Sequence, residues 1–368
     1  MLSSAELAAW LRLTESVDPA AVRRLLAIAD GPRAVFRLPA SVLDTALTTP
    51  QREALSRPPG HLDALIARAG AWLAEPGHGL LAFGDPDYPP RLLATTDPPP
   101  LLWLQGRRKL LGAPSIAVVG SRHPSAQGCD RARTLSRELA QAGYTIVSGL
   151  APGVDAAAHE GALDATGATI AVVGTGLDQV YPRHNKSLAA RLLAGGGLVV
   201  SEQALGMPVL PANFTRRNRI IAGLAQGCLV IEAAAPSGSL ITARRAAEAG
   251  RKVFATPTPL HASQARGCHT LIQQGAKQIE SAQEALAELQ RLTPAPHQAP
   301  VEPEEATKTS HERQALLDAM GFDPVSLDAL LARCGWSAAD LSAALLELEL
   351  GGQVAHLAGQ LYQRRQRG

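Results

Sequence analysis

The feature that most constrains the fold is a regular alternation of short apolar runs and helix-length segments from residue 115 onward. Each apolar run ends at glycine or a polar turn, and the intervening segments have the apolar spacing of helices. Continuous apolar strands separated by single helices are typical of a parallel sheet covered on both faces. The predicted strands are 115–120, 144–149, 168–174, 198–202, 228–232 and 252–257, and helices are predicted at 128–143, 155–167 and 184–194.

Different patterns flank this α/β region. Apolar spacing predicts short helices at 5–13, 20–28 and 40–47, whereas residues 293–310 are rich in proline and acidic residues, as linkers often are. Beyond them, helices at 311–320, 326–332 and 338–350 and a hairpin around Gly359 outline a winged helix. We therefore predict a small helical domain (1–75), an α/β domain with a parallel sheet (76–290), a linker (291–310) and a winged-helix-like domain (311–368).

Composition limits where a polyanion could bind. The formal net charge of the 368-residue chain is only +2, so any nucleic-acid site must be a local patch. The four cysteines form no CxxC pair, which argues against a zinc ribbon or a disulfide framework. The N-terminus does not read as a signal peptide, and no apolar run is long enough to span a membrane. We expect a cytoplasmic protein that does not interact with a membrane.

The loops that follow the predicted strands share glycine and small hydroxyl residues. Ligands of open parallel sheets bind beyond the carboxyl ends of the strands, where glycine permits close backbone approach and hydroxyls donate hydrogen bonds. Four such loops on one edge predict a polyanion or nucleotide site. Its candidate residues are Gly120, Ser121, Arg122, Gly149, Gly153, Gly174, Thr175, Gly176, Ser237, Gly238 and Ser239.

A second cluster is basic. Residues 214–224 place Arg216, Arg217, Asn218 and Arg219 at the expected start of an apolar helix, and Ser237 precedes another. Free N–H groups at a helix start, together with guanidinium groups, bind phosphates. The alternative is that these arginines form a solvated surface.

The evidence for catalysis is weaker. Asp155 and His159 are four residues apart and could form an acid–base pair or half a metal site, although we favour a helix-capping Asp155 and a His159 packed under the neighbouring loop. Glu232 could act as a base, bind the N–H groups of Ser237 or Ser239, or pair with an arginine. Neither GxGxxG nor GxxxxGK[ST] occurs. These residues require no enzyme activity, cofactor or metal.

Several long motifs follow one another in order from residue 120 to residue 276: GSRxPS, SGLAxGVDxxAHxGAL, TIAVVGTGLDxxYPxxN, LVVSE, RRNRIIAGL, LVIEAxxxSGSLITARxAxExGRxVFA and RGCHxLIxxGA. This series closely resembles the DprA (Smf) family of bacterial DNA-processing proteins over roughly residues 80–285. Thr215, Thr258 and Ala265 stand where the family commonly has proline, glycine and serine. The segment 257–269 is therefore the part of the predicted site that least resembles the family.

The resemblance implies that residues 76–290 form an extended Rossmann-like domain and that residues 1–75 form a SAM-like or helix-hairpin-helix-like domain. It also implies a homodimeric, non-enzymatic protein that binds single-stranded DNA in the cytoplasm. Such proteins protect incoming DNA during natural transformation and load the RecA recombinase onto it. On the matching motifs, the DNA-phosphate surface comprises Ser121, Arg122, residues 216–219 and residues 237–239. Tyr181 and Phe214 are the aromatic residues that could stack on bases, although both fit core positions better.

Two further expectations come with the resemblance. The rival function is a nucleotide-processing enzyme similar to phosphoribohydrolases, but residues 236–242 lack the PGGxGT loop of that group. The expected recognition helix of the winged-helix-like domain, 337–350, contains Asp340, Glu347 and Glu349 and no basic residue. Because these carboxylates would be repelled by phosphates, we expect this domain to contact protein, with Arg364, Arg365 and Arg367 in a flexible basic tail.

Overall fold

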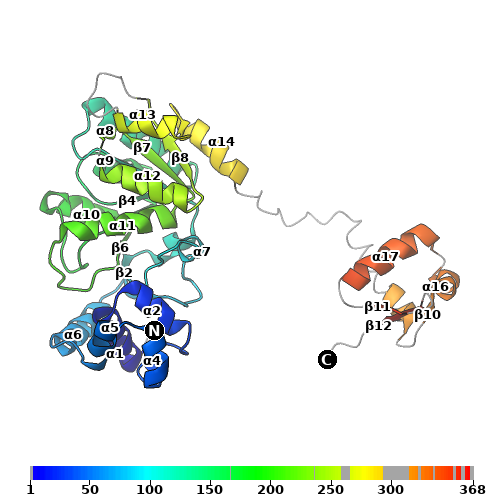
Figure 1. Ribbon diagram of the computed structural model, residues 1–368. Helices are drawn as coiled ribbons and strands as arrows, with labels where there is room; N and C mark the ends of the chain where they lie inside the picture. The colour runs from blue at the N-terminus through cyan, green and yellow to red at the C-terminus, as the bar shows by residue number, and fades with distance from the viewer. Residues whose placement is uncertain are drawn as a thin grey trace. The chain divides into compact units, whose positions relative to one another are not determined.

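The structure is a computed structural model that describes residues 3–165, 167–235, 237–257, 266–292, 315–321, 325–334, 336–350, 354–357 and 361–364. The chain divides into two compact units, Met1–Leu292 and Thr293–Gly368 (Figure 1). From residue 293 onward, the predicted linker lies outside the described residues.

The larger unit is built on a nine-stranded sheet with the order β1-β2-β6-β5-β4-β3-β7-β8-β9. Pairing is parallel from β6 through β9, whereas β1 pairs antiparallel with β2 and β2 with β6. This mostly parallel α/β sheet confirms the predicted fold class, but β1, β2 and β9 were not predicted. The strands are β1 His78–Ala82, β2 Leu101–Gly106, β3 Ser115–Gly120, β4 Thr145–Ser148, β5 Thr169–Val173, β6 Leu198–Ser201, β7 Gly227–Ile231, β8 Lys252–Ala255 and β9 Lys277–Gln278.

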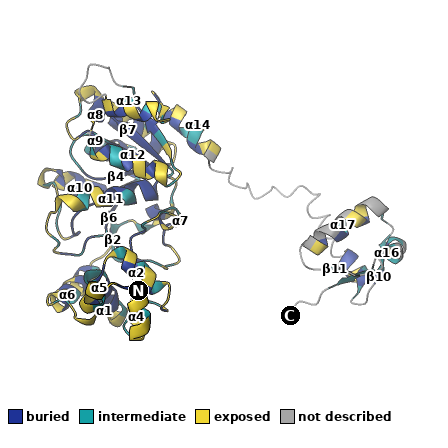
Figure 2. Cartoon of the chain, viewed as in Figure 1, coloured by how far each residue is buried: buried dark blue, intermediate teal, exposed yellow. Residues whose placement is uncertain are grey.

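Helices bury both faces of this sheet, and the central strands are dark blue in Figure 2. Successive residues of a strand point to opposite faces, so Val118 and Val119 of β3 lie in different cores. The core around Val119 includes helices α7 Pro90–Leu93, α11 Pro211–Leu224, α12 Gly238–Glu248 and α13 Arg266–Gln273. The core around Val118 includes α8 Ala126–Gln141, α9 Val154–Leu163 and α14 Ala282–Leu292.

The N-terminal helices share a core with the sheet. Leu13, Leu25 and Trp72 lie in the same buried cluster as Trp103 of β2 and Ala171 of β5, and α10 Lys186–Ala194 contributes to it. The predicted domain boundary between residues 75 and 76 falls inside this core, and that division of the chain stays a prediction. The N-terminal helices are α1 Ser4–Ser16, α2 Pro19–Leu26, α3 Pro32–Val35, α4 Ala40–Ala46, α5 Thr49–Ser56 and α6 Leu62–Leu73.

Local sequence explains where several of these helices begin. The Asp18 carboxylate accepts hydrogen bonds from the N–H groups of Ala20 and Ala21, and Pro19 occupies the first turn of α2. The Ser125 hydroxyl accepts a hydrogen bond from the N–H of Gly128 at the start of α8. Two 3-10 turns, Arg108–Gly112 and Arg183–Asn185, complete the unit.

The smaller unit has the arrangement expected of a winged helix. Residues 315–320 are helical and precede α16 Leu327–Cys334 and α17 Ala338–Leu350. A small antiparallel sheet has the order β10-β12-β11. Its strands are β10 Val325–Ser326, β11 Val354–Leu357 and β12 Leu361–Arg364. The predicted hairpin pairs as β11 with β12, β10 was not predicted, and Gly359 lies outside the described residues.

Arg364 does not belong to a flexible tail. It is the last residue of β12, and its Nη1 donates a hydrogen bond of 3.1 Å to the Leu317 carbonyl. Arg365 and Arg367 lie outside the described residues. In the described part of the chain, no helix combines the length and apolar character needed to cross a membrane.

Candidate functional site

An open groove of about 1940 Å³ lies at the carboxyl edge of the parallel strands. Its lining includes residues 120–123 at the end of β3, Gly149 after β4, residues 177–183 after β5 and residues 237–239 after β7. The chain proceeds from β3 to one side of the sheet and returns at β7 on the other side. This reversal is the topological switch point at which open α/β sheets bind ligands.

The groove collects most of the predicted site residues. Its lining includes Gly120, Ser121, Arg122, Gly149, Arg217, Asn218, Ser237, Gly238 and Ser239. Arg122 and His123 are exposed within it. The predicted residues outside the lining are Gly153, Gly174, Thr175, Gly176, Arg216 and Arg219.

The glycines outside the lining allow tight packing around the groove. A Cβ on Gly153, which has a φ of 78°, would lie 2.4 Å from the Ser121 carbonyl oxygen. A Cβ on Gly174 would lie 3.1 Å from the Phe214 ring, and one on Gly176 would lie 2.5 Å from the Ala204 carbonyl. These positions therefore keep neighbouring loops close together.

Helix α11 carries the basic cluster but starts earlier than predicted. Pro211 occupies its first turn, and the backbone of Leu210 is extended at the N-cap. The arginines consequently project from the middle of the helix, and the prediction that they surround its free N–H groups is wrong. Pro211 was the available signal, because proline favours the first helical position.

Arg217 forms part of the floor of the groove. Its side chain is buried, with 4% of the residue exposed, and its Nη1 donates a hydrogen bond to the Val172 carbonyl. A Cβ on Gly149 would lie 1.7 Å from Nη1, so only glycine leaves room for the guanidinium. Burial lowers the pKa of Arg217 to about 10, an effect that nearby Asp155 opposes. The group therefore stays cationic at neutral pH, and within the described part of the chain its Nε donates no hydrogen bond.

Buried polar groups hold the loop after β4 beside Arg217. Leu150 has a left-handed backbone with a φ of 57°. Its N–H donates to His159 Nε2 at 3.3 Å, and its carbonyl accepts from Asn185 Nδ2 at 2.8 Å. His159 Nδ1 lies 2.7 Å from the Thr169 hydroxyl oxygen, and burial lowers the pKa of His159 to about 3. His159 thus lies neutral under the loop, as the favoured interpretation predicted.

Asp155 supports the same loop. Its Oδ2 accepts a hydrogen bond of 3.1 Å from the N–H of Gly149, and burial raises the pKa of its carboxyl group while Arg217 opposes the rise. The N-cap of α9 is Gly153, without a side-chain hydrogen bond, so the prediction that Asp155 caps this helix is wrong. The carboxylate instead bridges the helix to the preceding loop.

Glu232 anchors the start of α8. Its carboxylate accepts hydrogen bonds from the Ser125 N–H at 2.7 Å and from the Ser125 hydroxyl at 2.5 Å. A Cβ on Gly128 would lie 2.5 Å from its Cδ. This contact was not among the predicted ones, because the partner serine lies in the loop after the neighbouring strand β3, and a role for Glu232 as a base stays a prediction.

Helix α12 begins directly after Ser237, as predicted. Ser237 is the N-cap and makes no side-chain capping hydrogen bond. The Ser237 and Ser239 hydroxyls lie 2.9 Å apart, and Asn218 of α11 donates to the Gly238 carbonyl at 3.2 Å. The first N–H groups of a helix lack intrahelical partners, so this end of α12 adds positive potential to the groove.

Arg216 and Arg219 lie in a different environment. Arg219 Nη2 lies 2.6 Å from Glu202 Oε1, and its Nε lies 3.0 Å from Asp97 Oδ2. Arg216 Nε lies 3.4 Å from Glu202 Oε2. Acidic partners from distant parts of the sequence thus pair with both arginines, whose neighbour Arg217 faces the groove.

Another wall of the groove was not predicted from the sequence. It carries the exposed cations Arg183 and Lys186 and the exposed His184. Tyr181, 42% exposed, lies with its ring centroid 5.4 Å from that of Phe214, so its assignment to the core is wrong. The available signal was the position of residues 181–186, directly after the glycine-rich loop that follows β5.

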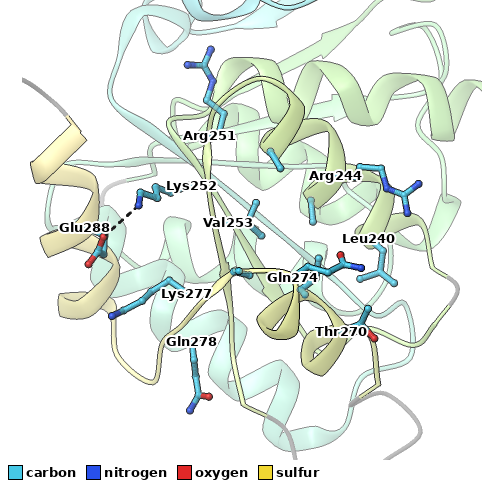
Figure 3. Close-up of a pocket in the computed structure, with 15 residues that line it drawn as sticks. Leu240, Arg244, Arg251, Lys252, Val253, Thr270, Gln274, Lys277, Gln278 and Glu288 are labelled. Atoms are coloured by element: carbon cyan, nitrogen blue, oxygen red, sulfur yellow. Dashed lines mark ion pairs between the residues drawn. The ribbon is translucent and has the colours of Figure 1, made fainter.

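A second pocket, of about 550 Å³, lies among α12, α13, α14, β8 and β9 (Figure 3). Arg244, Arg251, Lys252 and Lys277 surround it, and Lys252 Nζ lies 3.9 Å from Glu288 Oε2. Its lining contains no predicted site residue. The groove, where glycines, hydroxyls and cations converge, is therefore the stronger candidate.

Comparison with known proteins agrees with this architecture. Residues 79–290 match the family model of DNA recombination-mediator protein A, and residues 295–360 match that of the DprA winged helix domain. Protein Smf of Escherichia coli is 43% identical over 294 residues, which cover 78% of each chain.

Two solved structures are also similar. DNA processing protein A (DprA) of Streptococcus pneumoniae superimposes with a TM-score of 0.67 at 36% identity, covering 78% of this chain and 98% of that one. DNA processing protein A of Helicobacter pylori, from a study of its single-stranded-DNA binding mode, has a TM-score of 0.53 at 31% identity, covering 58% of this chain and 96% of that one. The sequence, the fold and both family models together show that the chain belongs to the DprA/Smf family of DNA-processing proteins.

Proposed function

We propose that this protein binds single-stranded DNA in the groove at the carboxyl edge of its sheet. The observation that carries the proposal is Arg217, a buried cation on the groove floor whose Nε has no hydrogen-bond partner among the described residues. A buried charge is costly unless it is compensated. Asp155 is the nearby carboxylate of the protein, and a phosphate in the groove would add further negative charge beside the guanidinium.

The surroundings of Arg217 suit a polynucleotide backbone. Arg122 is exposed at the groove, and the start of α12, where the first N–H groups lack intrahelical partners, lies at its lining near Ser239. Phosphate contacts of this kind hold DNA of any sequence. Tyr181 and Phe214 provide apolar ring surfaces on which bases could stack, as in other single-strand binders.

The wider role that we propose is that of a recombination mediator. The protein would protect incoming single strands in the cytoplasm during natural transformation, act as a homodimer and load the RecA recombinase. Support comes from membership of a family described as recombination mediators and from the H. pylori relative studied for single-stranded-DNA binding. This role requires binding without bond cleavage, so we propose that the protein is not an enzyme.

The test is fluorescence anisotropy with labelled single- and double-stranded oligonucleotides across a NaCl series. We expect tighter binding to single strands, little dependence on sequence, and a logarithmic salt slope of about −0.7 for each phosphate contact. Arg122→Gln should reduce the magnitude of that slope by about 0.7 and leave the fold intact. Absence of binding, or release of a free base from nucleoside monophosphates, would contradict the proposal, the latter in favour of the phosphoribohydrolase-like enzyme.

A further inference from the structure

Ion pairs connect three distant parts of the sequence next to helix α11. Arg219 of α11 pairs with Glu202, after β6, at 2.6 Å and with Asp97, in the segment before β2, at 3.0 Å. Asp97 also pairs with Arg23 of α2 at 2.7 Å. We call Arg23, Asp97, Glu202 and Arg219 the α11 ion-pair network. It joins the N-terminal helices to the helix that supplies Arg217 to the groove.

The centre of this network is shielded from water. The side chains of Arg219 and Glu202 are only 11% and 8% exposed. Tyr88 is buried beside them and donates a hydrogen bond of 2.8 Å to the Pro99 carbonyl. Coulomb interactions are stronger where water is excluded, and breaking a buried pair leaves an uncompensated charge. The network therefore resists displacement of α11.

The same helix determines where the groove cation lies. Arg217 is two residues from Arg219, so a rotation or shift of α11 moves both side chains together. The Arg217 guanidinium fits a narrow site, with the Val172 carbonyl on one side and Gly149 on another. Small displacements of α11 would consequently remove the guanidinium from this site.

We infer that Arg219, Glu202 and Asp97 are positioning residues for the anion site, and that the N-terminal helices contribute to it through Arg23. This inference rests on the proposed binding of single-stranded DNA. It differs from a phosphate-binding role for Arg219, because the guanidinium is already paired with two carboxylates. The network fixes Arg217 and does not itself meet the ligand.

Replacing an acidic residue of the α11 ion-pair network distinguishes a positioning effect on DNA affinity from an effect of overall charge. Loss of a negative charge near a polyanion site strengthens binding if only the overall field matters. Loss of a positioning residue weakens binding, although the protein has become more positive. Asp97 suits this test because its side chain is 41% exposed, so the folded protein can tolerate its neutralisation.

The experiment compares Asp97→Asn with Asp87→Asn in the full-length chain. Asp87 lies in the same connection between β1 and β2 and pairs with Arg108 at 2.8 Å, outside the α11 ion-pair network. Binding of a labelled oligothymidylate is followed by anisotropy over a salt series. We expect Asp97→Asn to weaken affinity by about twofold to thirtyfold, the usual range for such coupling, and Asp87→Asn to leave it within about twofold.

Two further measurements identify a positioning effect. The salt slope of Asp97→Asn should equal that of the wild type, whereas loss of a phosphate contact reduces it by about 0.7. Arg23→Gln should weaken binding similarly. The double variant should bind no more weakly than the weaker-binding single variant, because both changes break one chain of contacts. If Asp97→Asn lowers the thermal midpoint, binding is measured well below that temperature, because Arg23→Gln removes a positive charge and would weaken binding through the overall field as well.

The outcomes remain distinguishable from failure of the proposed function. If the wild type does not bind single strands, the proposed function fails. If the wild type binds and Asp97→Asn binds equally well or more tightly, the positioning role is overturned. A reduced salt slope in Arg219→Gln, with Asp97→Asn unaffected, would instead assign Arg219 to phosphate contact.

Discussion

The contact between Gly149 and Arg217 shows how one missing side chain creates a charged site. The guanidinium occupies the space in which any Cβ at position 149 would lie, 1.7 Å from Nη1. Gly149 is followed by Leu150, whose backbone is held by His159 and Asn185, so the loop cannot easily retreat. Room for Arg217 therefore depends on glycine at this position.

We predict that Gly149→Ala weakens single-stranded-DNA binding about tenfold or more, although it removes no charge. The alanine methyl displaces the guanidinium, and hydrogen bonds of charged groups contribute about 1.5–3 kcal/mol. Gly112→Ala is the matched control, because a Cβ there meets no atom within 4 Å. Wild-type affinity for Gly149→Ala, measured by anisotropy, would mean that the site does not use Arg217.

At the scale of single residues, the sequence predicted which residues line the groove better than it predicted the partners that they contact. The groove brings together Arg122, Arg217 and Ser239, as the strand-end argument expected. Arg219 could not be distinguished from Arg217 by sequence, because its partners Asp97 and Glu202 are distant along the chain. The stacking surface near Tyr181 was missed because exposure depends on tertiary packing.

Among the elements, the loop after β4 combines strain with buried support. Leu150 has a left-handed backbone that is unfavourable for a residue with a branched side chain, and His159 stabilises it only as a neutral acceptor. The lowered pKa of His159, about 3, means that the folded protein resists its protonation. The stability of this loop is therefore coupled to pH.

We predict that His159 makes the protein less stable as the pH falls from about 6.5 toward 3. In this window the unfolded chain binds a proton at His159 that the folded chain does not, so acid favours unfolding. The stability that depends on neutral His159 is fully present above the ordinary pKa of 6.5. The free energy of unfolding should fall by about 2 kcal/mol between pH 7 and pH 5 on this account.

Urea unfolding of the wild type and His159→Gln at both pH values measures this contribution. Glutamine can accept the Leu150 hydrogen bond but does not titrate. The variant should therefore lose less stability on acidification than the wild type. Identical losses in both proteins would show that His159 is not the responsible group.

The parallel strands were predictable because their apolar runs are continuous and end at glycine. The predicted 115–120 matches β3, and the predicted 228–232 is shifted by one residue from β7. β1 and β2 were missed because the prolines and turn residues between them indicated only a connection, and the helix α7 within that connection is only four residues long. The start of α11 was predicted too late, because it was inferred from the arginines and not from Pro211, which occupies the first turn.

At the scale of the whole molecule, the N-terminal helices and the sheet form one folding unit. Trp103 of β2 is 1% exposed, and its ring centroid lies 5.6 Å from that of Trp72 in α6. Both belong to the core that also holds Leu25 of α2. Residues that share one core unfold cooperatively.

We predict that Trp103→Ala destabilises the larger unit by about 3–5 kcal/mol, the usual cost of truncating a buried tryptophan. Hydrogen exchange should accelerate together in α1, α6 and the central strands. Trp336→Ala is the control, because Trp336 packs in the separate core of the smaller unit. Faster exchange confined to β2, with α1 and α6 still protected, would contradict a shared core.

The left-handed residues at the strand ends have a thermodynamic consequence. Leu150 follows β4 and Glu232 follows β7, the strands on either side of β3. Buried His159 accepts a hydrogen bond from Leu150, and the Glu232 carboxylate accepts hydrogen bonds from Ser125. The rim between them is thus preorganised, and association with a flexible polymer need not spend free energy on ordering the protein. The entropy lost in the encounter would come almost entirely from the polymer.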